Sequence, residues 1–327
     1  MSRRQVADHD GAGPILRAFR NFPRMLPRGY GTVARWIAQL ARTCDRVVVR
    51  TALGPTMMLD LGQDYHRYLY FGVHERATTA VLRHLLIPGT LFLDAGANVG
   101  YFSLLAASLC EKNCVLAFEA DPRYASVLRE NVALNGFTNL GVHAVALGNR
   151  CGTAQFVLAD ESGSGSSLET GHGAIARLLG EQFQRPVPVV DVPITTLDAG
   201  WGDTIKGWPG RVVLKLDIEG SEPDALEGAC GSLPHIDAAI VEQNPCLLGV
   251  HGHAPHAVAH ALGAAGLRTF LIEERWGRPV LRAVDGTFDG QVNLLALRTE
   301  LANEVSGTFR ILPPDYVARP AKPGCYH

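Results

Sequence analysis

After residue 88, short apolar runs alternate with segments whose apolar residues recur every three or four positions. The runs predict strands at 90–95, 114–119, 141–147, 154–159, 211–218, 238–242, 267–273 and 291–297. The intervening patterns predict helices at 99–110, 122–135, 222–230 and 256–265. Strands that alternate with helices are typical of a parallel sheet covered by helices. The pattern therefore predicts an α/β fold, in which the strand at 154–159 pairs beside the one at 141–147.

The pattern differs before residue 88. Residues 46–61 hold two β-rich stretches around Gly54-Pro55, which predict a hairpin, and residues 75–86 predict a helix. We interpret residues 46–88 as an N-terminal cap. The remaining divisions are a leader at 1–45, a main domain at 89–300 and a tail at 301–327. Within the main domain, the Ser- and Gly-rich stretch 161–173 predicts a mobile loop.

Charge is distributed unevenly along the 327 residues. The net charge of −2 gives no overall electrostatic case for a nucleic-acid partner, because such binding depends on Lys and Arg displacing counterions. Residues 1–50, however, carry ten Arg against three Asp, a local net charge of +7. A basic segment of this kind could meet an anionic membrane or partner, but we expect a solvated, partly disordered leader.

The seven cysteines, an odd number scattered from Cys44 to Cys325, do not form the pattern of a disulfide framework. Reduced thiols are typical of a cytoplasmic protein. No apolar run approaches the ~20 residues that a membrane span needs, and the Arg-rich start is not followed by the apolar stretch of a secretory signal. We therefore expect a cytoplasmic protein with no integral membrane segment.

The most informative segment is LFLDAGANVG, residues 91–100, in which an apolar strand ends in Asp94 and two glycines follow. Gly96 and Gly100 allow the backbone to pass close to a ligand, and the next helix directs its N–H groups at the same place. Glu119 ends the second strand 25 positions after Asp94, close to the separation at which a carboxylate binds both ribose hydroxyls. These features predict a nucleotide site.

The spacing of the glycines indicates which nucleotide is bound. A dinucleotide loop reads G-x-G-x-x-G and embraces a pyrophosphate, whereas this chain has D-x-G-x-x-x-G. The carboxylate of Asp94 would repel a pyrophosphate but would suit a ligand that carries an ammonium group. The loop therefore favours S-adenosylmethionine over NAD.

Six further motifs occur in the order found in FkbM-type methyltransferases, and the chain resembles that family over about residues 88–300. They are DAGANVGYFS at 94–103, FEADP at 118–122, NVALNG at 131–136, VALG at 145–148, TTLD at 195–198 and LKLDIEGSEPDALEGA at 214–229. The resemblance implies a class I, Rossmann-like methyltransferase fold with a mostly parallel seven-stranded sheet. It also implies O-methylation of a sugar, glycolipid or polyketide-type small molecule. Ala95 and Ala120 depart from the usual pattern.

On this reading, one set of residues binds the donor. Asp94, Gly96, Asn98 and Gly100 surround its methionine part, Glu119 holds the ribose, and Ala146 with Leu147 lines the adenine.

Acidic residues follow the next strands. Asp217 lies at the carboxyl end of the strand 211–218, where it could bind the donor's ammonium or take the acceptor's proton. Glu219 is the competing base. We expect Glu222 to stabilise a helix N-terminus, and for Glu242 an acceptor-side role and a simple strand-end charge are equally favoured.

The stretch HGHAPHAVAH offers His251 as a further base and places His256 and His260 one helical turn apart. Histidines indicate zinc or iron, whereas Asp217 and Glu219 would indicate magnesium, so the two halves suggest different ions. We therefore favour no metal. Two alternatives to a small-molecule O-methyltransferase remain open: a methyltransferase acting on RNA or protein, and a noncatalytic protein that binds S-adenosylmethionine.

Overall fold

The structure is a computed structural model, and it describes residues 14–26, 29–40, 46–159, 166–169, 173–284 and 290–313. Its centre is a nine-stranded sheet in the order β15-β13-β12-β14-β11-β10-β3-β4-β5. The strands are β3 (Leu91–Ala95), β4 (Cys114–Phe118), β5 (Leu140–His143), β10 (Val212–Leu216), β11 (Ala238–Gln243), β12 (Arg268–Arg275), β13 (Arg278–Ala283), β14 (Val292–Leu297) and β15 (Arg310–Leu312).

The resemblance implied a mostly parallel seven-stranded sheet, whereas the observed sheet has nine strands. The pairs β4·β5, β3·β4, β3·β10 and β10·β11 are parallel, while β14 runs antiparallel to both of its neighbours. Beyond β12, the sheet continues through β13 and β15, which the sequence analysis did not expect. In the sheet, β4 and β10 lie on opposite sides of β3, so the strand order reverses direction at β3. Open α/β sheets bind ligands in the crevice at such a switch point.

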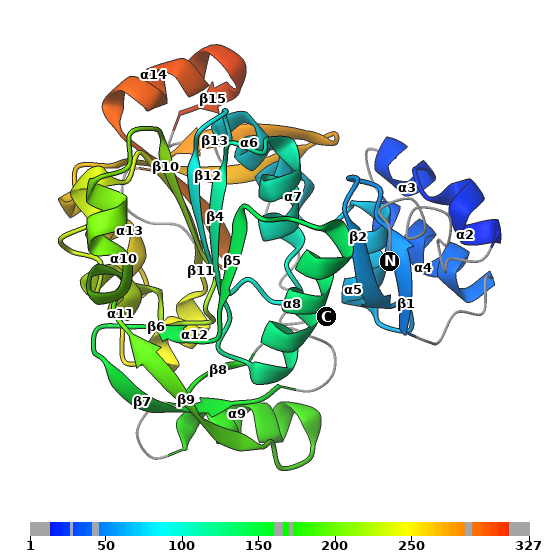
Figure 1. Cartoon of the computed structure of the whole chain (residues 1–327), viewed down its shortest axis with the longest axis horizontal. Coiled ribbons are helices and arrows are strands. Elements are labelled where there is room, and N and C mark those ends of the chain that lie inside the picture. Colours follow the sequence, from blue (N-terminus) through cyan, green and yellow to red (C-terminus); the bar gives the residue numbers. More distant parts are fainter. Residues whose placement is uncertain are drawn as a thin grey trace.

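Helices cover both faces of the main sheet (Figure 1). One face packs on α6 (Arg76–Leu85), α7 (Tyr101–Leu109) and α8 (Pro122–Asn135), and the other on α10 (Leu197–Lys206), α11 (Glu222–Glu227) and α13 (Ala257–Ala264). Every residue of β3 and β10 is buried, as expected for parallel strands covered on both sides. The shorter helices α12 (Pro245–Val250) and η1 (Leu233–His235) flank β11, and α14 (Thr299–Thr308) precedes β15.

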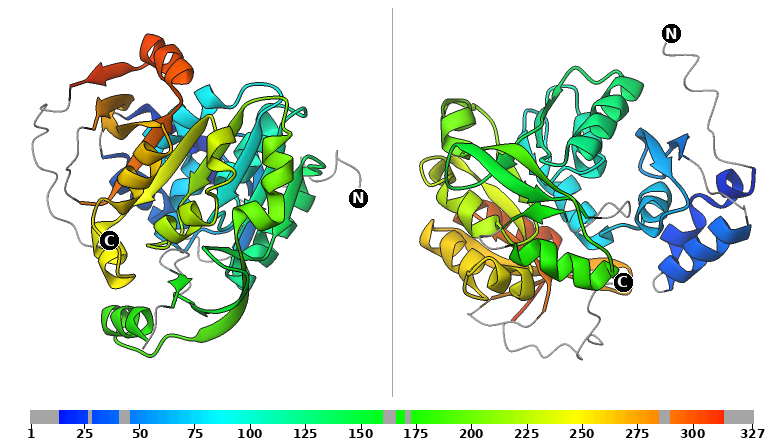
Figure 2. Two further views of the ribbon diagram at one scale, coloured as in Figure 1. Left: turned by 90° about the vertical axis from the view of Figure 1, so that its left-hand side faces the viewer. Right: turned by 90° about the horizontal axis from the view of Figure 1, so that it is seen from below.

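A second, four-stranded sheet lies at the end of the main sheet where the parallel strands finish (Figures 1 and 2). Its order is β6-β9-β7-β8, formed by β6 (Ala146–Leu147), β9 (Val189–Thr195), β7 (Gly152–Val157) and β8 (Ser167–Leu168), with α9 (Ala174–Phe183) beside it. The expected pairing of 154–159 with 141–147 is wrong, because β5 ends at His143 and β7 pairs with β8 and β9. Most of the expected mobile loop at 161–173, namely residues 161–165 and 170–172, lies outside the described residues.

The N-terminal part contains the expected hairpin, β1 (Arg46–Arg50) and β2 (Thr56–Asp60), followed by α5 (Asp64–Phe71). Asn131 and Asn135 of α8 fasten the hairpin to the main domain, since their side-chain oxygens accept from Met58 N (2.6 Å) and Thr56 N (2.8 Å). Within the expected leader, the described residues form α2 (Pro14–Phe19), α3 (Phe22–Met25) and α4 (Tyr30–Leu40), and residues 1–13, 27–28 and 41–45 lie outside the described part of the chain. The sequence analysis considered the arginines of this segment but not its apolar residues, such as Leu16 and Ala34, which are buried.

Regular structure continues past residue 300, the expected end of the main domain. Residue 300 lies inside α14, which ends at Thr308, and β15 then pairs with β13 through Leu312. We therefore propose that the main domain ends at Leu312. In the part of the chain that the structure describes, no helix is long and apolar enough to cross a bilayer.

Candidate functional site

The glycine loop after β3 is held tightly against neighbouring protein atoms. Gly96 N and Ala97 N both donate to Phe118 O at 3.0 Å, which draws the loop across the end of β4. A Cβ on Gly96 (φ 79°) would lie 1.8 Å from the carbonyl oxygen of Asp217, and one on Gly100 (φ 96°) 2.2 Å from Leu128 Cδ1. The sequence analysis explained both glycines by the approach of a ligand, whereas the packing of the loop against protein already requires them.

Glu119 connects this loop to the end of β4. Its Oε2 accepts from Asn98 N at 2.6 Å and its Oε1 from Asp121 N at 2.8 Å. Asn98 adopts a left-handed conformation (φ 51°), which directs its N–H at the carboxylate. Burial raises the pKa of Glu119 to about 7, although the two N–H donors oppose the shift.

Asp94 is buried below the loop with incomplete hydrogen bonding. Ser103 Oγ donates to its Oδ2 at 2.5 Å, while its buried Oδ1 has no hydrogen-bond partner among the described residues. Burial raises the pKa of Asp94, opposed in part by Lys215. A buried carboxylate oxygen without a donor is costly, so this atom is a natural acceptor for a ligand's polar hydrogen.

Lys215 is one of the site residues that the sequence analysis missed. Its Nζ lies 2.7 Å from Asp217 Oδ2 and 4.8 Å from the centroid of the Phe102 ring, and its side chain is 3% exposed. Burial alone would lower the pKa of Lys215, but Asp217, Glu75 and Asp94 outweigh burial and raise it. The sequence did contain a signal for Lys215: a lysine in the otherwise apolar strand VVLKL is expected to be buried, and a buried charge needs a partner.

The cap contributes two groups to the same place. Glu75 Oε2 accepts from Asn293 Nδ2 at 3.0 Å, and its Oε1 lies 3.2 Å from His74 Nε2. Burial would raise the pKa of Glu75, but His74 and Lys215 hold it at about 2. Burial raises the pKa of Tyr65, and the carboxylates around it raise it further. The cap residues Tyr65 and Glu75 therefore face the glycine loop and Asp217.

Asp217, Glu219 and Glu242 form a carboxylate cluster at the ends of β10 and β11, with one oxygen from each within 4.8 Å of the others. Burial raises the pKa of Glu242, and the charges of Asp217 and Glu219 raise it further. Gln291 Nε2 donates to Glu242 Oε1 at 2.5 Å. Three carboxylate oxygens could hold a hard divalent cation, although Lys215 already neutralises Asp217.

His251 lies beside this cluster rather than in it. Ser167 Oγ donates to Glu219 O at 2.8 Å, so His251 Nε2, 3.2 Å from the same hydroxyl, must be the donor to it. His251 Nδ1 is then left as an acceptor for Ser221 Oγ at 3.5 Å. Burial lowers the pKa of His251. Both ring nitrogens therefore serve to join β8 to the turn after β10.

The remaining predicted residues are Glu222 at the start of α11 and the pair Ala146 and Leu147 in β6. Glu222, at the start of α11, accepts from Ile218 N (2.9 Å) and from Gly220 N (3.0 Å), and burial raises its pKa to about 8. Ala146 and Leu147 are buried in β6, where Leu147 packs in the same cluster as Phe118. The adenine-lining role of Ala146 and Leu147 stays a prediction.

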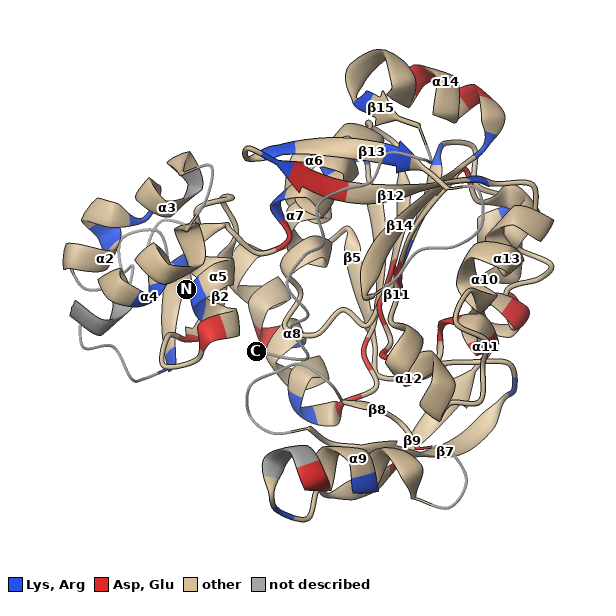
Figure 3. Cartoon of the chain, turned by 180° about the vertical axis from the view of Figure 1, so that it is seen from behind, with Lys and Arg blue, Asp and Glu red and all other residues tan. Residues whose placement is uncertain are grey.

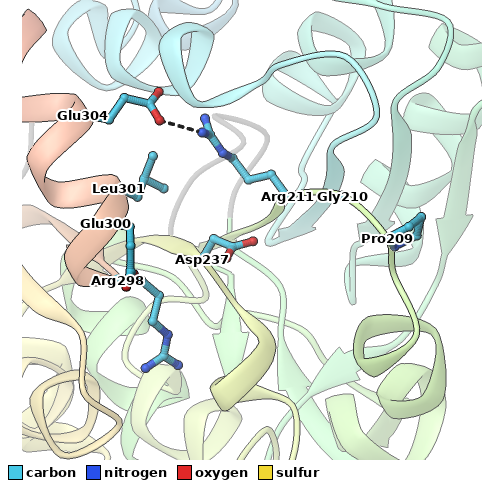
Figure 4. A pocket seen from close by; sticks show the side chains of 8 residues that line it. All are labelled: Pro209, Gly210, Arg211, Asp237, Arg298, Glu300, Leu301 and Glu304. Atoms are coloured by element: carbon cyan, nitrogen blue, oxygen red, sulfur yellow. Dashed lines mark hydrogen bonds and ion pairs between the residues drawn. The ribbon is translucent and has the colours of Figure 1, made fainter.

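A separate hollow lies at the opposite edge of the sheet, between α14 and the segments that precede β10 and β11 (Figure 4). Most of its charged groups are paired with protein: Arg211 Nη2 lies 3.0 Å from Glu304 Oε2, and Asp237 Oδ2 accepts from Val212 N at 2.7 Å. The guanidinium of Arg298 donates to three backbone carbonyls. This hollow is therefore a weaker candidate than the carboxyl edge.

Comparisons with known proteins agree with the resemblance seen in the sequence. The model of the methyltransferase FkbM domain matches residues 94–254. Methyltransferase 1 of Beauveria bassiana is 26% identical over 151 residues, which is 42% of this chain and 58% of that protein. The chain thus spans less than two thirds of that relative.

Two solved structures of methyltransferases match the chain at low identity and low TM-score. Precorrin-6y C5,15-methyltransferase from Geobacter metallireducens is 12% identical over 69% of this chain and 89% of its own, with a TM-score of 0.35. A putative O-methyltransferase from Klebsiella pneumoniae is 12% identical over 69% of this chain and 80% of its own, with a TM-score of 0.37. At these scores the likenesses carry no argument about function. The motifs and the family model together identify residues 94–254 as an FkbM methyltransferase domain.

Proposed function

We propose that the protein transfers a methyl group from S-adenosylmethionine to a hydroxyl of a small molecule, either a sugar or glycolipid or a polyketide-type product. The observation that carries the proposal is the charge of the site. The charges of Asp217, Glu75 and Asp94 act on the buried ammonium of Lys215, and Glu119 accepts from the glycine loop at Asn98 N. A donor with an ammonium and a sulfonium group would balance this negative charge.

Each residue has a defined task in this proposal. When bound, the donor supplies a methyl group made reactive by the sulfonium. The carboxylate of Glu119 accepts from the ribose hydroxyls, and the unpaired Oδ1 of Asp94 accepts a polar hydrogen from the methionine side. Asp217, held by Lys215, either binds the donor's ammonium or takes the acceptor's proton. In-line positioning supplies much of the rate, and a general base adds about 10²–10⁴-fold.

The proton acceptor is expected among the carboxylates rather than at His251. Glu219 has φ 55°, a strained conformation that is often kept at functional sites, and it shares the cluster with Asp217 and Glu242. Both ring nitrogens of His251, in contrast, are used by serine hydroxyls.

We expect Asp217→Asn and Glu219→Gln to bind S-adenosylmethionine but to lose about 10²-fold or more of turnover, as removal of a general base should. Calorimetry measures donor binding, and transfer of labelled methyl from the donor into a metabolite extract measures turnover. Glu300→Gln, an exposed change at the opposite edge, is the matched control. Unchanged turnover in both site variants would exclude them as the base, and absence of donor binding in the unmodified protein would refute the proposed function itself.

Donor affinity should depend on pH through Glu119. Its pKa in the folded protein is about 7, above the ordinary value of 4.5, so the folded state keeps the proton and this group opposes folding increasingly as pH rises towards about 7. The ionised form is the better acceptor for ribose hydroxyls. We expect affinity to rise about tenfold between about pH 6 and about pH 8. Glu119→Gln removes the titrating group, so an equally steep rise in that variant would contradict the assignment.

A further inference from the structure

The N-terminal helices expose an unusual number of large apolar side chains. Ile15, Phe19 and Phe22 are 44–48% exposed, Met25 is 77% exposed and Trp36 is 68% exposed. Side chains such as Leu16 and Ala34 are buried between the same helices, so the segment has an inner packed side and an outer apolar one. Exposed apolar groups that gather in one region mark an interaction surface.

Contacts connect most of these side chains into one strip. Ile15 and Phe19 lie one turn apart on α2, the rings of Phe19 and Phe22 meet edge to face at 6.4 Å, and Phe22 and Met25 share a face of α3. Each member adjoins the next, so the exposed apolar surface is continuous along α2 and α3.

The strip continues onto the main domain at the tip of the β12–β13 hairpin, which points toward α3 (Figure 1). Arg76 joins the two parts: its Nη1 donates to Leu26 O at 2.7 Å and its Nη2 to Gly277 O at 3.5 Å, and its guanidinium lies 4.8 Å from the centroid of the Tyr30 ring. The residues that supply these acceptors, Leu26 and Gly277, directly follow Met25 and Trp276 in the sequence, and Trp276 is 69% exposed. We call Ile15, Phe19, Phe22, Met25 and Trp276 the apolar strip.

The charge beside α2–α4 is positive (Figure 3), whereas the hairpin also carries Glu274 and Glu273, and Glu273 Oε2 lies 3.6 Å from Arg275 Nη2. Between Asp10 and Asp45 the sequence has six Arg and no acidic residue, and Figure 3 shows basic residues on α2, α4 and the hairpin. Arg35 is paired with Asp64 at 3.0 Å, which still leaves the segment strongly positive. At the hairpin tip, Arg275 and Arg278 flank the exposed Trp276.

We infer that the apolar strip is a docking surface for an anionic lipid bilayer, with the arginines held at the headgroups. Trp and Phe beside Arg are the composition of segments that lie in the membrane interface. Basic residues near an anionic surface are attracted to it, so several of them together with the apolar groups give stable but reversible attachment. Docking of this kind is peripheral and needs no membrane-spanning helix.

Vesicle sedimentation with the full chain tests this inference without methyl transfer, so its failure is distinct from failure of the proposed function. The protein should sediment with vesicles of equal parts phosphatidylcholine and phosphatidylglycerol but not with phosphatidylcholine alone, and added salt should release it. We expect Met25→Ala and Trp276→Ala each to weaken binding about fivefold, and the double variant more. Thermal unfolding shows that the variants remain folded.

Ile87→Ala together with Val189→Ala is the matched control, because both side chains are 42% exposed and lie outside the strip. This variant should bind as the unmodified protein does. Three results would overturn the inference: no binding to anionic vesicles, equal binding to both kinds of vesicle, or strip variants that change only the oligomeric state in sedimentation velocity. The last result would identify a second copy of the chain as the occupant.

Discussion

Replacement of Gly96 by alanine should destabilise the protein by roughly 2–5 kcal/mol and abolish donor binding. The residue has φ 79°, and the new Cβ would lie 1.8 Å from the carbonyl oxygen of Asp217. That oxygen belongs to the backbone, so no flexible side chain can move aside. Because Asp217 N donates to Ala95 O at 3.0 Å, any shift that relieves the collision also displaces the Lys215–Asp217 pair.

Gly89→Ala separates the collision from the backbone strain. Gly89 has φ 89°, but a Cβ there would meet no heavy atom within 4 Å. This variant should lose only the left-handed penalty of about 1–2 kcal/mol and keep its affinity for S-adenosylmethionine. Urea unfolding gives the two free energies and calorimetry the two affinities. Equal losses in Gly89→Ala and Gly96→Ala would show that the close approach to Asp217 has no energetic consequence.

The sequence predicted best those elements whose signals are local. The helix α8 begins and ends where predicted, because Asp121 accepts from Arg123 N, Pro122 suits a first helical position, and Gly136 takes the left-handed conformation that ends the helix. The strands β3, β4, β10 and β11 were equally clear, since burial on both faces demands unbroken apolar runs. The region 174–206 was not predicted. Its strand β9 alternates between exposed and buried residues next to a Ser- and Gly-rich stretch, which weakened the pattern.

For the site, the sequence placed Asp94, Glu119 and Asp217 at strand ends, and the structure brings them together around the glycine loop. It could not place Tyr65 or Glu75, because their proximity to Asp217 depends on how the cap packs across more than 140 residues of chain. Lys215 was overlooked for a different reason: it lies within a strand that is otherwise apolar, and the sequence analysis considered the carboxylates without asking which cation pairs with them.

Lys215→Met should cost about 3–5 kcal/mol of stability, because it removes one member of a buried ion pair and leaves the other uncompensated. Asp217, Glu75 and Asp94 would then face one another without the ammonium that now lies 2.7 Å from Asp217. The loss should shrink as pH falls. The low pKa of Glu75, about 2, stabilises the unmodified protein above about pH 4.5, and this contribution disappears as acid protonates the carboxyl.

A double-mutant cycle identifies the source of this loss. Asp217→Asn in the Lys215→Met background removes one of the uncompensated charges and should restore part of the stability, whereas two independent sites would give additive losses. Lys206→Met, at the exposed end of α10, should change the free energy of unfolding by less than about 0.5 kcal/mol. Urea unfolding of the four proteins of the cycle at neutral and acidic pH measures each term. Additive losses that do not vary with pH would mean that Lys215 stabilises the strand by packing alone, and the charge balance from which we infer a cationic donor would lose its main support.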